Sequence, residues 1–241
     1  FGKSSNDASR EKAMKGLHEF LRPEFIGRVD EVVVFNELKE EDYKKIIGSA
    51  TELESKAYKS LLKNIGTKGG VAVFNQNSFV SDGYVNHNGK TYRVNGIPAK
   101  GYKVIELADA DKAYTLNGKI LETSNYIVEF NDEYVITRLY DKVNEREVLR
   151  EGGRANYIEA FEDYPYEYDA WEISKYYTEK KYEISDVSDV KFLDEGSRFG
   201  FEITRKFYKS IIKQKIYFYD GSNRIDFDTY ADWHQEHLML K

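Results

Sequence analysis

The chain has 241 residues, a formal net charge of −6 and 41% hydrophobic residues, which is enough apolar material for a core. Such a composition indicates a globular protein with one large domain or two small ones. The acidic balance, without any basic run, argues against a nucleic-acid partner held by phosphate contacts. The lack of cysteine excludes disulfides and thiolate metal sites and is compatible with a reducing cytoplasm.

Membrane association is not expected either. No apolar run approaches the roughly 18 residues of a membrane span, and the first residues lack the basic-then-apolar layout of a signal peptide. The sequence therefore predicts a soluble, cytoplasmic protein with no membrane partner. The chain begins at Phe1 and ends at Lys241, and we expect both ends to be cuts through something longer.

The first part of the chain has helical periodicity. Residues 5–21 have acids, bases and an apolar stripe at helical spacing, and Pro23 is expected to stop that helix. A short β-branched strand is predicted over Val29–Phe35, followed by helices over 39–47 and 51–65. The glycines that follow break the pattern, so a boundary is predicted near residue 66.

Beyond Gly70 the apolar residues alternate with a period of two. The β-rich runs are separated by Asn-Gly, Asp-Gly and Gly-Ser pairs, which are typical of antiparallel hairpins. The last three runs reach about ten residues, which favours broad stacked sheets over a small barrel. In one of these runs the alternation predicts a core face and a wet face, with Phe201, Ile203 and Arg205 against Glu202, Thr204 and Lys206.

The stretch from Arg154 to Tyr177 combines tyrosines, a tryptophan and carboxylates around Pro165. Rings and carboxylates presented together suit a sugar, because its C–H faces stack on aromatics while its hydroxyls hydrogen-bond to acids. Residue type alone suggests Asp169 and Trp171 as substrate-binding residues. The more common role of such residues is core packing with a few solvated acids, and that alternative also applies to Asp163 and Asp169 as a catalytic pair.

The histidines near the C-terminus invite a metal interpretation. Asp232, His234 and His237 are residue types that suit zinc. However, positions three apart on a strand point to opposite faces, and the spacing does not match the HExxH arrangement. We therefore favour structural hydrogen bonding here and predict no metal site in the chain. His18 and His87 are expected at the surface.

The aspartates of the preceding strand need partners of opposite charge. Asp226, Asp228 and Asp232 have even spacing, so they share one strand face and repel one another. Pairing with lysine or arginine is expected, with the neighbouring strand around residues 211–215 as the candidate donor. Calcium is an alternative that no turn loop supports.

Two family resemblances cover different parts of the chain. LRPEFIGRVDEVVVFNEL, from Leu21 to Leu38, resembles Clp-type AAA+ unfoldases, and the likeness extends over residues 1–47. The resemblance implies that Arg28 is an arginine finger acting on the γ-phosphate of a neighbouring subunit. Residues 2–4 supply only the tail of a phosphate-loop pattern, which is more simply a chance loop, so ATPase activity is not predicted.

Residues 48–241 resemble the zinc-dependent α-mannosidases of glycoside hydrolase family 38. Five segments match in family order: VAVFNQNSF (71–79), GIPAKGYKVIEL (96–107), and residues 126–149, 161–173 and 225–241. The departures from the family pattern are Gln76-Asn77, Phe79 and Leu238-Met239. The resemblance implies a helix over 48–66 from the end of the helical domain. It also implies a mainly β fold over 67–241, an incomplete antiparallel β-supersandwich.

The same resemblance implies a function. In this family the nucleophile, the acid and the zinc ligands lie on an N-terminal barrel and helical domain, in motifs that this chain lacks. The chain would then be the non-catalytic β region that supports and walls the active site of an α-mannosidase. Zinc is expected in the complete parent enzyme, mannose-containing glycans as its partners, and self-association through an open edge strand.

Two alternatives belong to other functional classes. With 20 tyrosines and 14 phenylalanines, the chain could be a free-standing carbohydrate- or protein-binding module. It could also be a fragment of a partner-dependent ATPase, if the N-terminal resemblance carries the function. Because the two families do not ordinarily share a chain, a fusion or a misassembled reading frame is the simplest origin. The junction is placed between Lys39 and Ser49.

Overall fold

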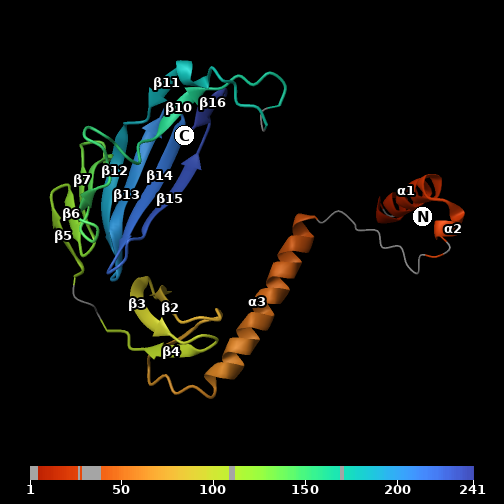
Figure 1. Cartoon of the computed structure of the whole chain (residues 1–241), viewed down its shortest axis with the longest axis horizontal. Coiled ribbons are helices and arrows are strands. Elements are labelled where there is room, and N and C mark those ends of the chain that lie inside the picture. The colour runs from red at the N-terminus through yellow and green to blue at the C-terminus, as the bar shows by residue number, and fades with distance from the viewer. Residues whose placement is uncertain (1–4, 27, 29–38, 109–111, 169–170) are drawn as a thin grey trace. The chain divides into compact units, whose positions relative to one another are not determined.

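The computed structural model describes residues 5–26, 28, 39–108, 112–168 and 171–241 (Figure 1). The chain divides into two compact units, residues 1–66 and residues 67–241. The strand predicted over Val29–Phe35 and the phosphate-loop tail over residues 2–4 lie outside the described residues.

The first unit is helical. Helix α1 (Ser5–Phe20) confirms the predicted first helix, and α2 (Pro23–Ile26) begins at the proline, whose fixed φ suits a first helical position. The prediction of two further helices was wrong, because α3 is continuous over Glu40–Leu62. Gly48 does not interrupt α3, and the Thr51 hydroxyl donates 2.9 Å to the Ile47 carbonyl within it, a bond that a helix tolerates. Among the described helices, none is both long and apolar enough to cross a membrane.

The second unit is built of antiparallel sheets, which confirms the predicted mainly β architecture. Two small sheets pair β1 (Val71–Phe74) with β4 (Tyr102–Ile105), and β2 (Ser81–His87) with β3 (Lys90–Ile97). A five-stranded sheet runs in the order β5 (Tyr114–Asn117), β6 (Ile120–Thr123), β7 (Tyr126–Phe130), β8 (Ile136–Asp141) and β9 (Arg146–Glu147).

Two further sheets complete the described part of the unit (Figure 1). A three-stranded sheet has the order β11 (Lys181–Glu183), β10 (Glu159–Glu162) and β16 (Leu238–Leu240). The four-stranded sheet has the longest strands, in the order β12 (Val187–Asp194), β13 (Arg198–Phe207), β14 (Ser210–Tyr219) and β15 (Ile225–Asp232). We call it the long sheet.

The main core lies between the five-stranded sheet and the long sheet. Leu121, Val128 and Phe130 pack from the first sheet against Phe199, Phe201 and Ile216 of the second. The side chains of two sheets that face each other in this way form a sandwich core. The alternation predicted for β13 is confirmed, because Phe201, Ile203 and Arg205 are buried while Lys206 is exposed.

A smaller core lies at the other end of the same face. Ala160, Ile184 and Ile212 form its centre, and the indole of Trp233 stacks on the ring of Phe207 with 5.7 Å between centroids. This core joins the three-stranded sheet to the long sheet. The position of β10, from which the next segment of the chain begins, is therefore set by this core.

The outer face of the long sheet is polar, as predicted, but its acidic residues are paired differently. Asp226 accepts two hydrogen bonds from Arg224, each of 2.7 Å, rather than one from a lysine of β14. Lys215, one of the two lysines on the strand expected to supply a partner, lies opposite Asp228 in register, and its Nζ is 3.8 Å from Glu202 of β13. The bonds from Arg224 hold the pKa of Asp226 below its ordinary value.

Among the described strands, β15 is at one edge of its sheet. Self-association through an open edge strand stays a prediction.

Candidate functional site

A groove of about 560 Å³ lies in the segment that follows β10. It is lined mainly by tyrosines and charged side chains, including Glu162, Tyr164, Tyr166, Tyr176, Tyr177 and Lys180. We call it the tyrosine groove. It is formed by the part of the sequence in which aromatic and acidic residues crowd around Pro165.

The irregular backbone of this segment presents its rings in different ways. The Trp171 and Glu172 amides both donate to the Tyr168 carbonyl, at 3.1 and 2.9 Å. The Tyr166 side chain is 82% exposed and that of Trp171 is 89% exposed. Large apolar rings with this exposure contribute little to a core, so the core-packing alternative does not account for them.

Two other rings of the groove are held in place by contacts with neighbouring side chains. Tyr164 stacks on His237 with 4.7 Å between ring centroids and an interplanar angle of 18°. Tyr177 packs edge-on against Phe161 at 5.3 Å, and its hydroxyl accepts a bond of 3.2 Å from Lys241. The β10–β16 pairing therefore holds two rings in place beside the exposed ones.

The groove also carries fixed polar groups. Lys180 donates to the Glu162 carboxylate, and this hydrogen bond raises the pKa of Lys180. The Lys175 ammonium lies 4.8 Å from the centroid of the Tyr176 ring, a cation–π contact. Donors, acceptors and ring faces are thus present together, which is the combination that a sugar requires.

The residues predicted from type alone are only partly placed. Asp169 lies outside the described residues, so the proposed pair of Asp163 and Asp169 stays untested. Trp171 is on the same segment as the groove but is not one of its lining residues. The Asp163 amide donates 2.9 Å to the His237 carbonyl, and its buried Oδ1 has no hydrogen-bond partner among the described residues.

The histidines do not converge on a metal. His234 Nε2 lies 2.9 Å from Asp232 Oδ1, whereas the ring of His237 stacks on Tyr164. Within the described part of the chain no three acidic or histidine side chains group as metal ligands. Asp232, His234 and His237 therefore do not form a set of metal ligands among the described residues. His18 is exposed as predicted, and His87 is half-buried in β2.

Several carboxyl groups are held in the ionised form. The pKa values of Asp132, Asp141, Glu183 and Asp226 are below the ordinary values for these residue types. The largest cause in each case is a side-chain hydrogen bond, from Lys119, Asn144, Arg154 and Arg224 respectively. A general acid in glycoside hydrolysis needs the opposite shift, so these four groups are unsuited to that role.

Arg28, the arginine finger of the N-terminal resemblance, lies in a turn of the first unit. Its side chain is exposed, and its amide donates 3.0 Å to the Phe25 carbonyl. The expectation that Arg28 resembles an arginine finger without acting as one stays a prediction, because the phosphate-loop tail is outside the described residues.

The family comparison covers just over half of the chain. The model of the Glycosyl hydrolases family 38 C-terminal domain matches residues 121–241, from β6 through the long sheet to the last residue. A search of curated proteins finds no match. The matched part does not include residues 1–120, so the AAA+ resemblance of 1–47 and the mannosidase resemblance of 48–120 stay predictions. Because its C-terminal half is this domain, the chain belongs to glycosyl hydrolase family 38.

Proposed function

We propose that the second unit is the non-catalytic β region of an α-mannosidase, and that its tyrosine groove binds mannose-containing glycans beside the active site of the whole enzyme. The observation that carries the proposal is the groove itself, in which exposed and anchored rings lie among paired charges on a family 38 domain. Zinc, in this proposal, belongs to the complete parent enzyme and not to this chain.

The groove suits a neutral sugar for physical reasons. The ring of Tyr166 is free to stack on the C–H face of a pyranose, as is that of Trp171. Glu162 and Lys180 form an ion pair that offers an acceptor and a donor to vicinal hydroxyls, and Glu179 adds a second acceptor. Because each contact is weak and exposed, we expect affinities in the millimolar range, which is about 4 kcal/mol.

A supporting role in catalysis follows from two observations. The carboxyl groups with shifted pKa values are held ionised, so they do not provide a protonated acid. The family resemblance assigns the nucleophile, the acid and the metal ligands to motifs that this chain lacks. We infer that the β region orients a glycan while the rest of the enzyme cleaves it.

A free-standing carbohydrate-binding module is the second candidate. Every residue that lines the tyrosine groove comes from the second unit, so the groove does not depend on another domain for its shape. That independence favours binding by the chain alone.

Titration of the full chain with α-1,2-mannobiose tests the groove. We expect saturable binding, with Tyr166→Ala weakening it at least about fivefold, because a ring–sugar stack is worth about 1 kcal/mol. Trp171→Ala tests whether the exposed ring outside the groove also contacts the sugar. The matched control is Tyr230→Ala, which removes a ring that is also exposed, but on the outer face of β15. Calorimetry measures the affinity of the unsubstituted chain and of each variant for the disaccharide.

Binding that is absent, or that Tyr230→Ala weakens as much as Tyr166→Ala does, would contradict the groove assignment. A loss with Tyr166→Ala but not with Trp171→Ala would confine the sugar to the groove, whose lining does not include Trp171.

A further inference from the structure

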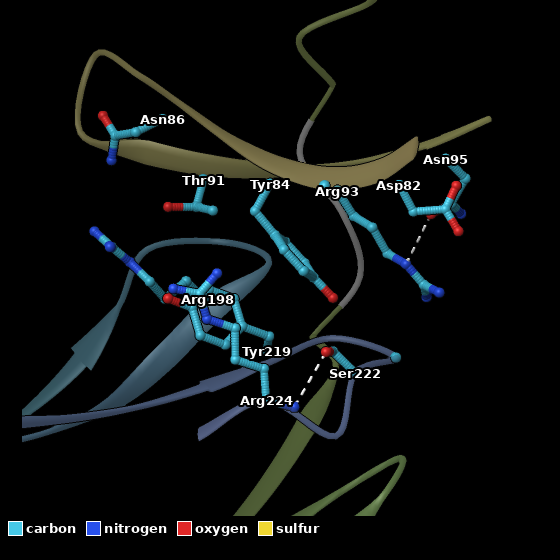
Figure 2. A pocket seen from close by; sticks show the side chains of 12 residues that line it. Asp82, Tyr84, Asn86, Thr91, Arg93, Asn95, Arg198, Tyr219, Ser222 and Arg224 are labelled. Carbon is cyan, nitrogen blue, oxygen red and sulfur yellow. Dashed lines mark hydrogen bonds between the residues drawn. The ribbon is translucent and has the colours of Figure 1, made fainter. Parts of the chain in front are cut away.

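A second cavity, of about 530 Å³, lies between the β2–β3 hairpin and one end of the long sheet (Figure 2). We call it the arginine cleft. Tyr84, Thr91 and Arg93 line it from the hairpin, and Arg198, Tyr219 and Arg224 from the sheet. The alternation of β13 and β14 places Arg198 and Tyr219 on the outer face, away from the sandwich core.

The walls of the cleft are tied together by hydrogen bonds. The Thr91 amide donates 2.7 Å to the Glu195 carbonyl, and the Ser197 amide donates 2.8 Å to the Thr91 carbonyl. The Tyr84 hydroxyl donates to the Asp220 carbonyl at 2.5 Å, and its ring packs on Tyr219 with 4.8 Å between centroids. The cleft is therefore formed before any ligand enters, which lowers the entropic cost of binding.

Carboxylates behind the cleft orient its guanidinium groups. Arg198 Nε donates 2.8 Å to Glu195, and Arg224 forms its two bonds to Asp226. Arg93 is held more loosely. Its Nε donates 3.2 Å to Asn95 Oδ1 (Figure 2). Its Nη1 lies 4.0 Å from Asp220 Oδ2. The donors of Arg93 are consequently the most available to a ligand.

The charge balance decides which ligand class fits. Three arginines meet four carboxylates in and behind the cleft, those of Asp82, Glu195, Asp220 and Asp226. With no excess of positive charge, the cleft has little to attract a phosphate or sulfate group. Oriented donors, carboxylate and amide acceptors and a tyrosine ring suit a ligand with many hydroxyls and no charge.

One further feature indicates that the cleft is built for a ligand, and another shows how Arg93 is accommodated beside it. The Thr91 hydroxyl is buried and has no hydrogen-bond partner among the described protein atoms, although buried hydroxyls normally have one. Gly221 has φ +61°, and a Cβ there would lie 1.8 Å from Arg93 Nη1. Glycine thus leaves room for the Arg93 guanidinium against the β14–β15 turn.

We propose that the arginine cleft is a second saccharide-binding site, for a neutral oligosaccharide. It lies at the Tyr219 end of β14, whereas the tyrosine groove lies beyond the Ser210 end, and ten strand residues span about 30 Å. The two sites are therefore separate, and the inference does not depend on sugar binding in the groove.

Side-chain NMR of ¹⁵N-labelled arginine in the full chain tests the proposal, with α-1,2-mannobiose, lactose and inorganic phosphate as probes. We expect the Arg93 Nε signal to shift saturably with at least one of the two disaccharides and not with phosphate. Arg93→Met and Thr91→Val should each weaken that binding at least fivefold, read from tyrosine and backbone signals of the cleft. Thr91→Val removes only a hydroxyl without a protein partner, so it preserves the fold.

The matched control is Arg138→Met, because the Arg138 side chain is 40% exposed and that of Arg93 is 37% exposed. Disaccharide binding that neither Arg93→Met nor Thr91→Val weakens would overturn the proposal, as would a response to phosphate alone or no response to any probe. If Tyr166→Ala abolished all sugar binding, the groove would be the sugar site and the cleft would not. Retained cleft binding in Tyr166→Ala would support two separate sites.

Discussion

Replacing Gly200 by alanine should destabilise the second unit by about 3 kcal/mol or more. Gly200 is buried in β13, where it pairs with Tyr217 of β14. A Cβ at this position would lie 1.8 Å from the Ile216 carbonyl oxygen and 2.9 Å from its carbon. Those are backbone atoms of a paired strand, so no rotamer change relieves the clash. The two central strands of the long sheet would have to separate.

Urea unfolding followed by circular dichroism measures this loss as a lower transition midpoint. Gly83→Ala is the matched control, because Gly83 is also in a strand but a Cβ there meets no atom within 4 Å. We expect it to change stability by less than about 0.5 kcal/mol. Equal effects of the two substitutions would show that close strand approach at Gly200 is not what the fold requires.

Arg205→Ala should also destabilise the unit, by about 3 kcal/mol. The Arg205 side chain is only 1% exposed, on the core face of β13, and burial lowers its pKa. Its Nη2 donates 2.9 Å to the Glu133 carbonyl, which belongs to the turn between β7 and β8. Truncation would leave that carbonyl unpaired and open a cavity between the sheets.

Arg205→Met separates the packing contribution of Arg205 from that of its charge. The methionine side chain fills much of the same volume but has no hydrogen-bond donor. Nη1 of Arg205 is buried without a partner among the described residues, so removing the charge also relieves a desolvation cost. We therefore expect Met to cost less than about 1.5 kcal/mol. Urea unfolding of both variants beside Arg138→Ala, which removes a half-exposed arginine of β8, gives the comparison. The packing explanation would be wrong if Met cost as much as Ala.

Much of the fold could be predicted from local sequence, because a period of two is a direct consequence of the pleat. The alternation placed Arg205 on one face of β13 with Phe201 and Ile203, and the structure shows that this face is buried. The periodic pattern predicted helix boundaries wrongly where a long helix tolerates an unfavourable residue. Separate helices were predicted over 39–47 and 51–65, yet α3 continues through Gly48 between them, since one glycine in a long helix costs only about 1 kcal/mol.

The candidate sites were predictable to different degrees. The tyrosine groove was suggested by residue type because its side chains come mostly from one short segment, although the guess named Asp169 and Trp171 rather than Tyr166 or Lys180. The arginine cleft had no such signal, since Arg93 is over 100 residues from Arg198 and the two meet only when the hairpin packs on the long sheet. The partner of Asp226 was missed for a related reason. Strand register sets which charges face each other, and spacing along the sequence does not reveal it.

The most direct test of the supporting role is hydrolysis of a chromogenic α-mannoside by the purified chain, with added zinc and with chelator. We predict no turnover in either condition, together with retained binding of α-1,2-mannobiose, because the chain would bind a glycan without cleaving it. Hydrolysis that chelator abolishes would contradict the account. It would mean that this chain completes a metal site, and Asp232, His234 and His237 would be the first residues to substitute.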